Sequence, residues 1–267
     1  MNSLHRALWA ETLKARRSRV SLATAAGFAL LPVIGGLFMV IMKDPERARA
    51  MGLIGEKAQL LSGGVADWPT YLQFLMVGTA AGGAILFAFI TAWVFGREFS
   101  DHTAKELLAV PTPREVIVGT KFVLIALWIM GLTVFVYVVG LVVGSAVGMP
   151  GWSLELAWRS FWALMATAGL TLMLMPFVAF FASMGRGYLP PLAWAFATLA
   201  LAQVAGVLGW GDRFPWSVPA QFSLMFSVMY GQRSEPTGIH SYLLVLVAFI
   251  AGMVGTFQWW RSADQTR

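Results

Sequence analysis

The sequence contains no cysteine, and charged residues make up only 12% of its 267 residues. Without cysteine the chain has no disulfide, no iron–sulfur cluster and no thiolate-bound zinc. A soluble domain usually carries about 25% charged residues, so this chain has too little polar surface for a globule in water. The hydrophobic content of 58% points the same way. Composition therefore argues against a soluble enzyme, a nucleic-acid-binding protein and a disordered chain.

The sequence also lacks the groups that several membrane activities require. Its six longest apolar segments contain no Asp, Glu, Lys, Arg or His, whereas proton- and ion-coupled transporters place ionisable groups there. The three histidines lie far apart, and no phosphate-binding loop of the Gly-x-x-x-x-Gly-Lys-Ser/Thr type occurs. The sequence thus predicts no catalytic residue, no metal site and no cofactor in this chain. Energy for active transport has to come from a partner.

What the chain has instead is a series of apolar segments long enough to cross a bilayer. A spanning helix needs about 20 mostly apolar residues. Pro32 and Pro176 lie inside such segments and are expected to kink them. The six predicted spans are residues 20–42, 71–95, 122–147, 161–184, 189–208 and 242–260. The expected fold is therefore an all-α membrane protein, with residues 1–267 forming a single transmembrane domain.

Positive charge is sorted unevenly between the two sides of this arrangement. With the N-terminus in the cytoplasm, the inner segments hold twelve Lys and Arg residues and the outer loops hold seven. An excess of Lys and Arg marks cytoplasmic loops. We therefore expect a multi-pass protein of the inner (plasma) membrane with both termini in the cytoplasm.

The loop between the second and third spans, residues 96–121, carries clear helix signals. Thr103 and Glu106 have the spacing of a capping box, in which each side chain binds a free N–H group of the first helical turn. Pro111 disfavours helix before it, so this helix covers about 103–110. Such a short helix is not stable alone and has to rest on another surface.

The apolar face of this short helix allows two interpretations. Leu107 and Leu108 share that face, so the helix either rests on lipid headgroups or docks into a cytoplasmic partner. The residues alone favour the headgroup interpretation. Thr112 and Glu115 form a second capping box, which predicts the start of the helix that becomes the third span.

Several segments of the chain resemble bacterial type-2 ABC transporter permeases, and in particular the group linked to bacitracin resistance and lantibiotic immunity. The resemblance extends over nearly the whole chain and includes the six-span topology. One departure is His102, where that group often has a small residue such as glycine. The matching residues are Arg97-Glu98-Phe99-Ser100-Asp101-His102-Thr103, Lys105-Glu106-Leu107-Leu108, Pro111-x-Pro113-Arg114, Lys121, Glu11-Thr-Leu-Lys14, Trp68-x-x-Tyr71, Gly185-Arg-Gly-Tyr188 and Phe214-Pro-Trp216.

The resemblance implies half of a transporter. Two permease chains would pair as a homodimer, and two copies of a separate cytoplasmic ABC ATPase, which binds ATP and Mg, would dock beneath them. The helix from Thr103 to the residue before Pro111 would be the coupling helix, with Leu107 and Leu108 filling an apolar groove of the ATPase. The polar rim of that contact would consist of Arg97, Glu98, Asp101, Lys105, Glu106 and Arg114.

The N-terminal residues also allow two compatible interpretations. Their basic side chains can anchor the chain to anionic headgroups of the membrane lipid. The family resemblance instead implies an elbow helix that lies along the membrane, with Glu11 and Lys14 paired one turn apart.

The resemblance implies export of a hydrophobic or amphiphilic compound, such as a peptide antibiotic, along a path between the two copies near the second and fifth spans. Gln73, Phe74 and Gln203 are the candidates to line it, although such polar groups also serve as hydrogen bonds between helices. The outer loop 209–241 is either an exit gate or an interfacial anchor. Export of sodium, a lipid or a glycan by the same machine, and a scaffold without transport, remain alternatives. A membrane-embedded enzyme is disfavoured.

Overall fold

The computed structural model describes residues 3–44, 65–101, 103, 112–225 and 237–262. All regular structure within these residues is helical. Six helices or helix pairs are long and apolar enough to cross a membrane, and they follow the predicted spans in order, which confirms the six-span all-α fold. They are Arg19–Lys43, Trp68–Ser100, Arg114–Val147, Leu154–Met184, Leu189–Val207 and Ile239–Ser262.

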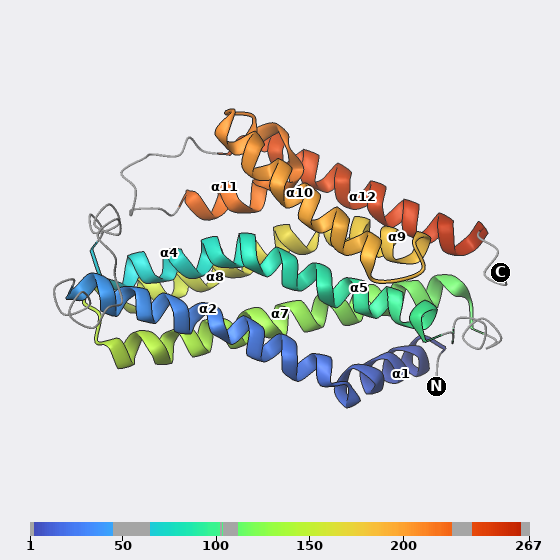
Figure 1. Cartoon of the computed structure of the whole chain (residues 1–267), viewed down its shortest axis with the longest axis horizontal. Helices are drawn as coiled ribbons and strands as arrows, with labels where there is room; N and C mark the ends of the chain where they lie inside the picture. The colour runs from blue at the N-terminus through green and yellow to red at the C-terminus, as the bar shows by residue number, and fades with distance from the viewer. Residues whose placement is uncertain (1–2, 45–64, 102, 104–111, 226–236, 263–267) are drawn as a thin grey trace.

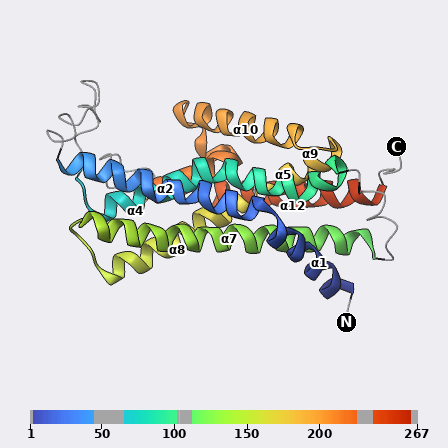
Figure 2. The same ribbon diagram turned by 60° about the horizontal axis from the view of Figure 1, so that its bottom comes forward.

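The helices lie side by side along the long axis of the molecule (Figure 1). Helix α1 and the last turn of α12 lie at the same end of the bundle, as an even number of spans requires. Figure 2 shows α10 on one face of the bundle and α7 with α8 on the opposite face. The helices are α1 (Ser3–Arg17), α2 (Arg19–Lys43), α4 (Trp68–Gly78), α5 (Ala84–Ser100), α7 (Arg114–Val147), α8 (Leu154–Leu172), α9 (Met175–Met184), α10 (Leu189–Val207), α11 (Val218–Leu224) and α12 (Ile239–Ser262).

The helix of the third span begins at the place predicted for it, but without the predicted cap. Helix α7 starts at Arg114, and its N-cap residue is Pro113, with no side-chain cap hydrogen bond. The capping box expected from Thr112 and Glu115 is therefore wrong. Glu115 instead forms an ion pair with Arg261 of α12 at 2.8 Å, because a tertiary partner is available to its carboxylate. The predicted helix start before the third span is confirmed.

Helices α1 and α2 are separated by a break at Ser18. The backbone of Ser18 is extended (φ −83°, ψ 142°), and its hydroxyl accepts a hydrogen bond from the N–H of Val20, as an N-cap residue does. Helix α1 consequently leaves the bundle at an angle in both views (Figures 1 and 2). A separate N-terminal helix is thus present, and its placement along the membrane stays a prediction.

Two of the spans are interrupted near their middle. The second span contains a π-helical segment, Thr79–Gly83, between α4 and α5, which the sequence analysis did not predict. The fourth span breaks between Leu172 and Met175, directly before Pro176. The kink expected at Pro176 is confirmed, because proline cannot donate the backbone hydrogen bond that would continue the helix. Pro32 lies inside the continuous helix α2.

The segment after α10 folds back against the bundle. Two short 3-10 turns, Gly211–Arg213 and Pro215–Ser217, lead into α11. Helix α11 packs against α8 and α4, and its Val218, Pro219 and Ser223 are buried. This part of the outer loop is therefore held inside the bundle, while residues 226–236 lie outside the described part of the chain.

Candidate functional site

Four charged side chains from three helices meet where α1 joins the bundle. They are Glu11 and Lys14 of α1, Glu98 of α5 and Lys121 of α7, and we call them the ion-pair network. The Lys121 Nζ lies 2.7 Å from Glu98 Oε1 and 3.5 Å from Glu11 Oε2. The Lys14 Nζ lies 2.8 Å from Glu11 Oε1 and 3.3 Å from Glu98 Oε1. The pairing of Glu11 with Lys14 that the family resemblance implied is thus present.

This network is shielded from the surface. The Lys121 side chain is 0% exposed, Glu98 is 5% and Glu11 is 8%, whereas Lys14 is 35%. Lysine offers three N–H donors, and Lys121 uses them on Glu98, on Glu11 and on the backbone oxygen of Val94 at 2.8 Å. A buried charge is tolerated when it is paired and hydrogen-bonded. With two carboxylates and two ammonium groups, the network is balanced in charge.

The electrostatics of the α1 members follow from this balance. Burial acts to raise the pKa of the Glu11 carboxyl, but the charges of Lys121 and Lys14 outweigh it, and the pKa lies below its usual value of 4.5. Burial acts to lower the pKa of the Lys14 ammonium, but Glu11 and Glu98 outweigh it, and the pKa lies above its usual value of 10.5. Both groups therefore stay charged at neutral pH, which keeps α1 attached to α5 and α7.

The end of α5 that leads into the segment 101–113 is fixed in two ways. Arg97 pairs through its Nε with Asp101 at 3.1 Å, and its guanidinium lies 5.1 Å from the ring centre of Trp93. The backbone N–H of Thr103 donates to the oxygen of Glu98 at 2.9 Å. Arg97 and Asp101 remain partly exposed at this end, and their place on the rim of an ATPase contact stays a prediction.

The beginning of α7, on the other side of this segment, is tied to α12. Arg114 Nη1 donates to the backbone oxygen of Trp260 at 3.1 Å, and Arg261 pairs with Glu115. The indole of Trp260 is buried and donates to the hydroxyl of Ser183 in α9 at 2.9 Å. Both flanks of the segment 101–113 are therefore anchored to neighbouring helices.

The structure differs from the sequence-based expectation at Glu98. Its carboxylate faces into the bundle and pairs with Lys121, so it is not part of an exposed rim. Lys121 itself was expected at the end of a loop, yet it lies on the third turn of α7, inside the bundle. The signal that could have found it is a lone lysine within an otherwise apolar helical stretch. The remaining residues of the expected coupling helix, Lys105, Glu106, Leu107, Leu108 and Pro111, lie outside the described part of the chain.

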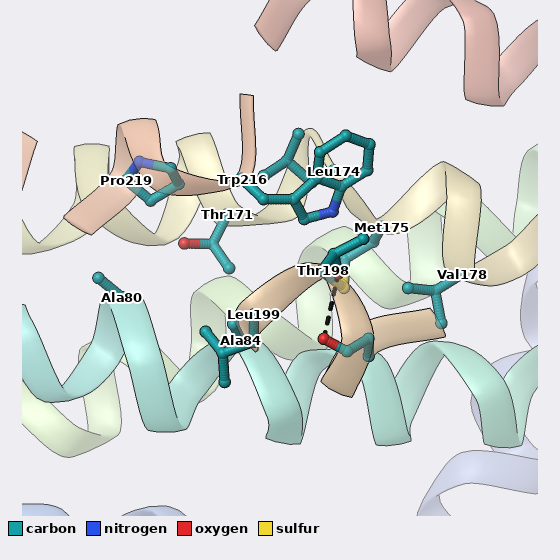
Figure 3. A pocket seen from close by; sticks show the side chains of 11 residues that line it. Ala80, Ala84, Thr171, Leu174, Met175, Val178, Thr198, Leu199, Trp216 and Pro219 are labelled. Carbon is teal, nitrogen blue, oxygen red and sulfur yellow. Dashed lines mark hydrogen bonds between the residues drawn. The ribbon is translucent and has the colours of Figure 1, made fainter. Parts of the chain in front are cut away.

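The two span interruptions meet at a small cavity of about 30 Å³ in the middle of the bundle (Figure 3). Ala80 comes from the π-helical segment, Leu174 from the break before α9 and Trp216 from the 3-10 turn before α11. Thr198 of α10 faces the same space and donates to the oxygen of Ala195 at 3.1 Å. The cavity has room for one water-sized molecule. Four separate chain segments therefore meet at a point where packing is incomplete.

The three residues expected along a substrate path do not come together. Gln73 is buried and donates through Nε2 to the oxygen of Ser223 in α11 at 2.6 Å. Phe74 stacks on Phe38 with ring centres 6.2 Å apart. Gln203 is exposed on α10. Gln73 thus holds α11 against the second span, the structural role open to such residues.

A bundle of six apolar spans defines a polytopic membrane protein, and among the described residues the buried charges lie in one network at one end. Residues 7–201 match the model of the ABC-2 family transporter proteins, and the chain belongs to this family. The chain is also similar to the bacitracin transport permease protein BCRB of Bacillus licheniformis. The two are 24% identical over 182 residues, which cover 68% of this chain and 85% of that protein.

Family membership sets the general role of the chain. Members of this family are non-catalytic transmembrane components of transporters and associate with an ABC ATPase. The chain is therefore a multi-pass transmembrane transporter subunit. The matched residues 7–201 contain the complete ion-pair network, the first four spans and most of the fifth.

Proposed function

We propose that this chain is the transmembrane subunit of an ATP-driven exporter for a hydrophobic or amphiphilic compound, such as a peptide antibiotic. Two copies of a separate ATPase bind ATP and Mg and dock on the segment 101–113, and two copies of this chain form the membrane part. The similarity to a bacitracin transport permease supports this substrate class. The excess of Lys and Arg on the network side supports a cytoplasmic position for that end and for both termini.

The anchoring of the segment 101–113 is the observation that carries this proposal. On one flank Glu98 of α5 is paired with Lys121 of α7 and with Lys14 of α1. On the other flank Arg114 binds the backbone of α12. A displacement of this segment by an ATPase would therefore move α1, α5, α7 and α12 together. It would not be limited to the segment itself.

The interrupted spans supply a place where such a displacement can be accommodated. Helix kinks and π-helical segments are positions where the backbone hydrogen-bond ladder is already broken. The segment Thr79–Gly83 and the break before Pro176 both border the central cavity. We place the hinge of the transport cycle there, between the ATPase end of the bundle and its opposite half.

An apolar groove supports a path near the second and fifth spans. The groove has a volume of about 580 Å³ and lies between α2, the second span and α10. Its lining includes Ile34 of α2, Gly82 and Phe89 of the second span, and Leu192 and Phe196 of α10. A second copy of the chain facing this groove would enclose an apolar passage that suits an amphiphile.

Co-expression with a candidate ATPase tests the proposal. An ATPase with a phosphate-binding loop, encoded next to this chain, should co-purify with it, and the two together should protect cells against a peptide antibiotic such as bacitracin. ATP hydrolysis by the complex should rise when the transported compound is added. The proposal fails if no ATPase binds, or if hydrolysis is the same with and without this chain. If the complex exported sodium or a lipid and not a peptide antibiotic, only the proposed substrate would change, and the proposed ATP-driven export would stand.

A further inference from the structure

A second groove lies between α1 and α5, at the end of the bundle where α1 leaves it. Its volume is about 540 Å³. Its lining combines cationic side chains with indole rings, and none of the described residues that line it is a carboxylate. The residues that define it are Trp9, Leu13, Lys14 and Arg17 of α1, and Trp93 and Arg97 of α5. We call it the α1–α5 groove.

The three cations of this groove differ in how far they are neutralised. Lys14 belongs to the ion-pair network and is balanced by Glu11 and Glu98. Arg97 uses its Nε on Asp101, a half-exposed carboxylate, and has further N–H groups on its guanidinium. Arg17 is exposed, and within the described part of the chain no ion pair involves it. The α1–α5 groove therefore carries uncompensated positive charge.

The position of the groove along the bundle matches the headgroup layer of a membrane. Ser18, which also lines it, is the residue between α1 and the first span. Trp93 and Arg97 lie in the last two turns of the second span, and the Trp9 side chain is 63% exposed. Tryptophan prefers the membrane–water boundary, with its ring among the headgroups. The groove thus opens to lipid at the depth of the phosphate groups.

We propose that the α1–α5 groove binds one phospholipid with an anionic headgroup. The lipid phosphate lies between Arg17 and Arg97, since guanidinium groups bind phosphate oxygens through paired N–H donors. The glycerol and the upper acyl chains lie against Trp9, Leu13 and Trp93. This lipid is a bound component of the protein and not the transported compound. It joins α1 to α5 beside the ion-pair network and strengthens the same contact from the outside.

Counting bound lipids on the full chain tests this site. The chain in detergent is titrated with phosphatidylglycerol or with phosphatidylcholine of the same acyl chains, and bound molecules are counted by native mass spectrometry. We expect the first phosphatidylglycerol to bind more tightly than phosphatidylcholine. Arg17→Gln should weaken this first binding about fivefold, the effect of one basic residue at an anionic surface. Arg97→Gln should weaken it by a similar factor.

Arg16→Gln is the matched control, because Arg16 is the exposed neighbour of Arg17 and does not line the groove. This variant loses the same charge from the same helix and should bind phosphatidylglycerol as the unaltered chain does. An equal loss in the Arg16 and Arg17 variants would show diffuse attraction and would overturn the site. Equal binding of the two lipids to the unaltered chain would also overturn it. Neither outcome bears on ATP-driven export, so a failure of this site is distinct from a failure of the proposed function.

Discussion

The Nζ atom of Lys121 lies 2.7 Å from Oε1 of Glu98, and neither side chain is more than 5% exposed. The two residues flank the segment 101–113, one before it on α5 and one after it on α7. Their ion pair holds the end of α5 against the beginning of α7. Lys14 and Glu11 extend the same contact to α1.

Removal of Lys121 should destabilise the folded chain strongly. Lys121→Met leaves Glu98 buried without its nearest cation, and the loss of one partner of a buried ion pair typically costs about 3–5 kcal/mol. We expect a clear drop in the thermal unfolding midpoint in detergent. The double variant Glu98→Gln with Lys121→Met should recover much of it, because Lys14 remains to pair with Glu11.

Arg159→Met provides the comparison for this experiment. Arg159 pairs with Glu155 at 3.6 Å, and these side chains are 70% and 80% exposed. Exposed ion pairs contribute little, so the midpoint should stay unchanged. A Lys121→Met chain as stable as the unaltered chain would show that the network does not hold the three helices together.

Glu11 should make the stability of the chain sensitive to acid. Its pKa is lower in the folded chain than its usual value of 4.5. Its charge therefore contributes stability that is fully present above that pH and is lost as the pH falls through the folded pKa. The difference in unfolding midpoint between the unaltered chain and Glu11→Gln should be constant between about pH 5 and 9 and shrink below pH 4.5.

Two further observations complete this pH test. The pKa of Lys14 is raised above 10.5, so its contribution to stability is lost only as the pH rises through that higher folded value. Lys14 therefore does not change the dependence of stability on pH in acid. Glu155→Gln removes a carboxylate that is 80% exposed and should leave the unfolding midpoint at neutral pH unchanged. A difference for Glu11→Gln that persists unchanged into acid would contradict an ionised, paired Glu11.

Gly252 of α12 packs directly against the beginning of α9. A Cβ atom at this position would lie 2.9 Å from the backbone nitrogen of Phe177 and 2.9 Å from Pro176 Cβ. The backbone cannot yield without moving the helices apart, so Gly252→Ala should cost about 1–3 kcal/mol of stability. Gly255→Ala, one turn away, meets only the ring of Phe180 at 3.5 Å and should leave the thermal unfolding midpoint unchanged or slightly higher. Equal midpoints for the two variants would contradict this helix contact.

Pro176 should matter for transport more than for stability. In Pro176→Ala the new N–H can donate to the oxygen of Leu172 and continue α8 into α9, so the hinge at the central cavity stiffens. We expect an unchanged or higher unfolding midpoint and a reduced resistance phenotype in cells that also express the ATPase. Pro190→Ala changes a proline in the first turn of α10, where no hydrogen bond is missing, and should leave both measurements unaltered. A Pro176→Ala chain that confers full resistance would show that the break before α9 is not needed for transport.

The sequence was sufficient to predict the spans, because the length of an apolar segment is a local property. The pairing of Glu11 with Lys14 was also local, three residues apart on one helix. The contact of Lys121 with Glu11 joins residues 110 positions apart, and no pattern along the chain shows which of several charges meet. Glu98 was placed on an exposed rim for this reason, since charge alone does not reveal which side of a helix is covered.

The middle of the bundle was equally hard to foresee. Pro176 predicts a break because proline lacks the N–H that would continue the helix, whereas we found no local pattern that predicts the π-helical segment Thr79–Gly83. Gly140 and Gly144 of α7 lie against the side chains of Leu75 and Trp68 of the second span, a contact between distant residues that their spacing does not reveal.

The central claim is that the segment 101–113 carries the docking site for an ABC ATPase, and Leu108→Asp tests it most directly. The affinity-purified chain is assayed for bound ATPase and for its own unfolding midpoint. A Leu154→Asp chain serves as the control, because Leu154 is 80% exposed at the opposite end of the bundle. We predict that Leu108→Asp loses the ATPase while the midpoint is unchanged, and that Leu154→Asp retains it. A stable complex of ATPase with the Leu108→Asp chain would contradict the account.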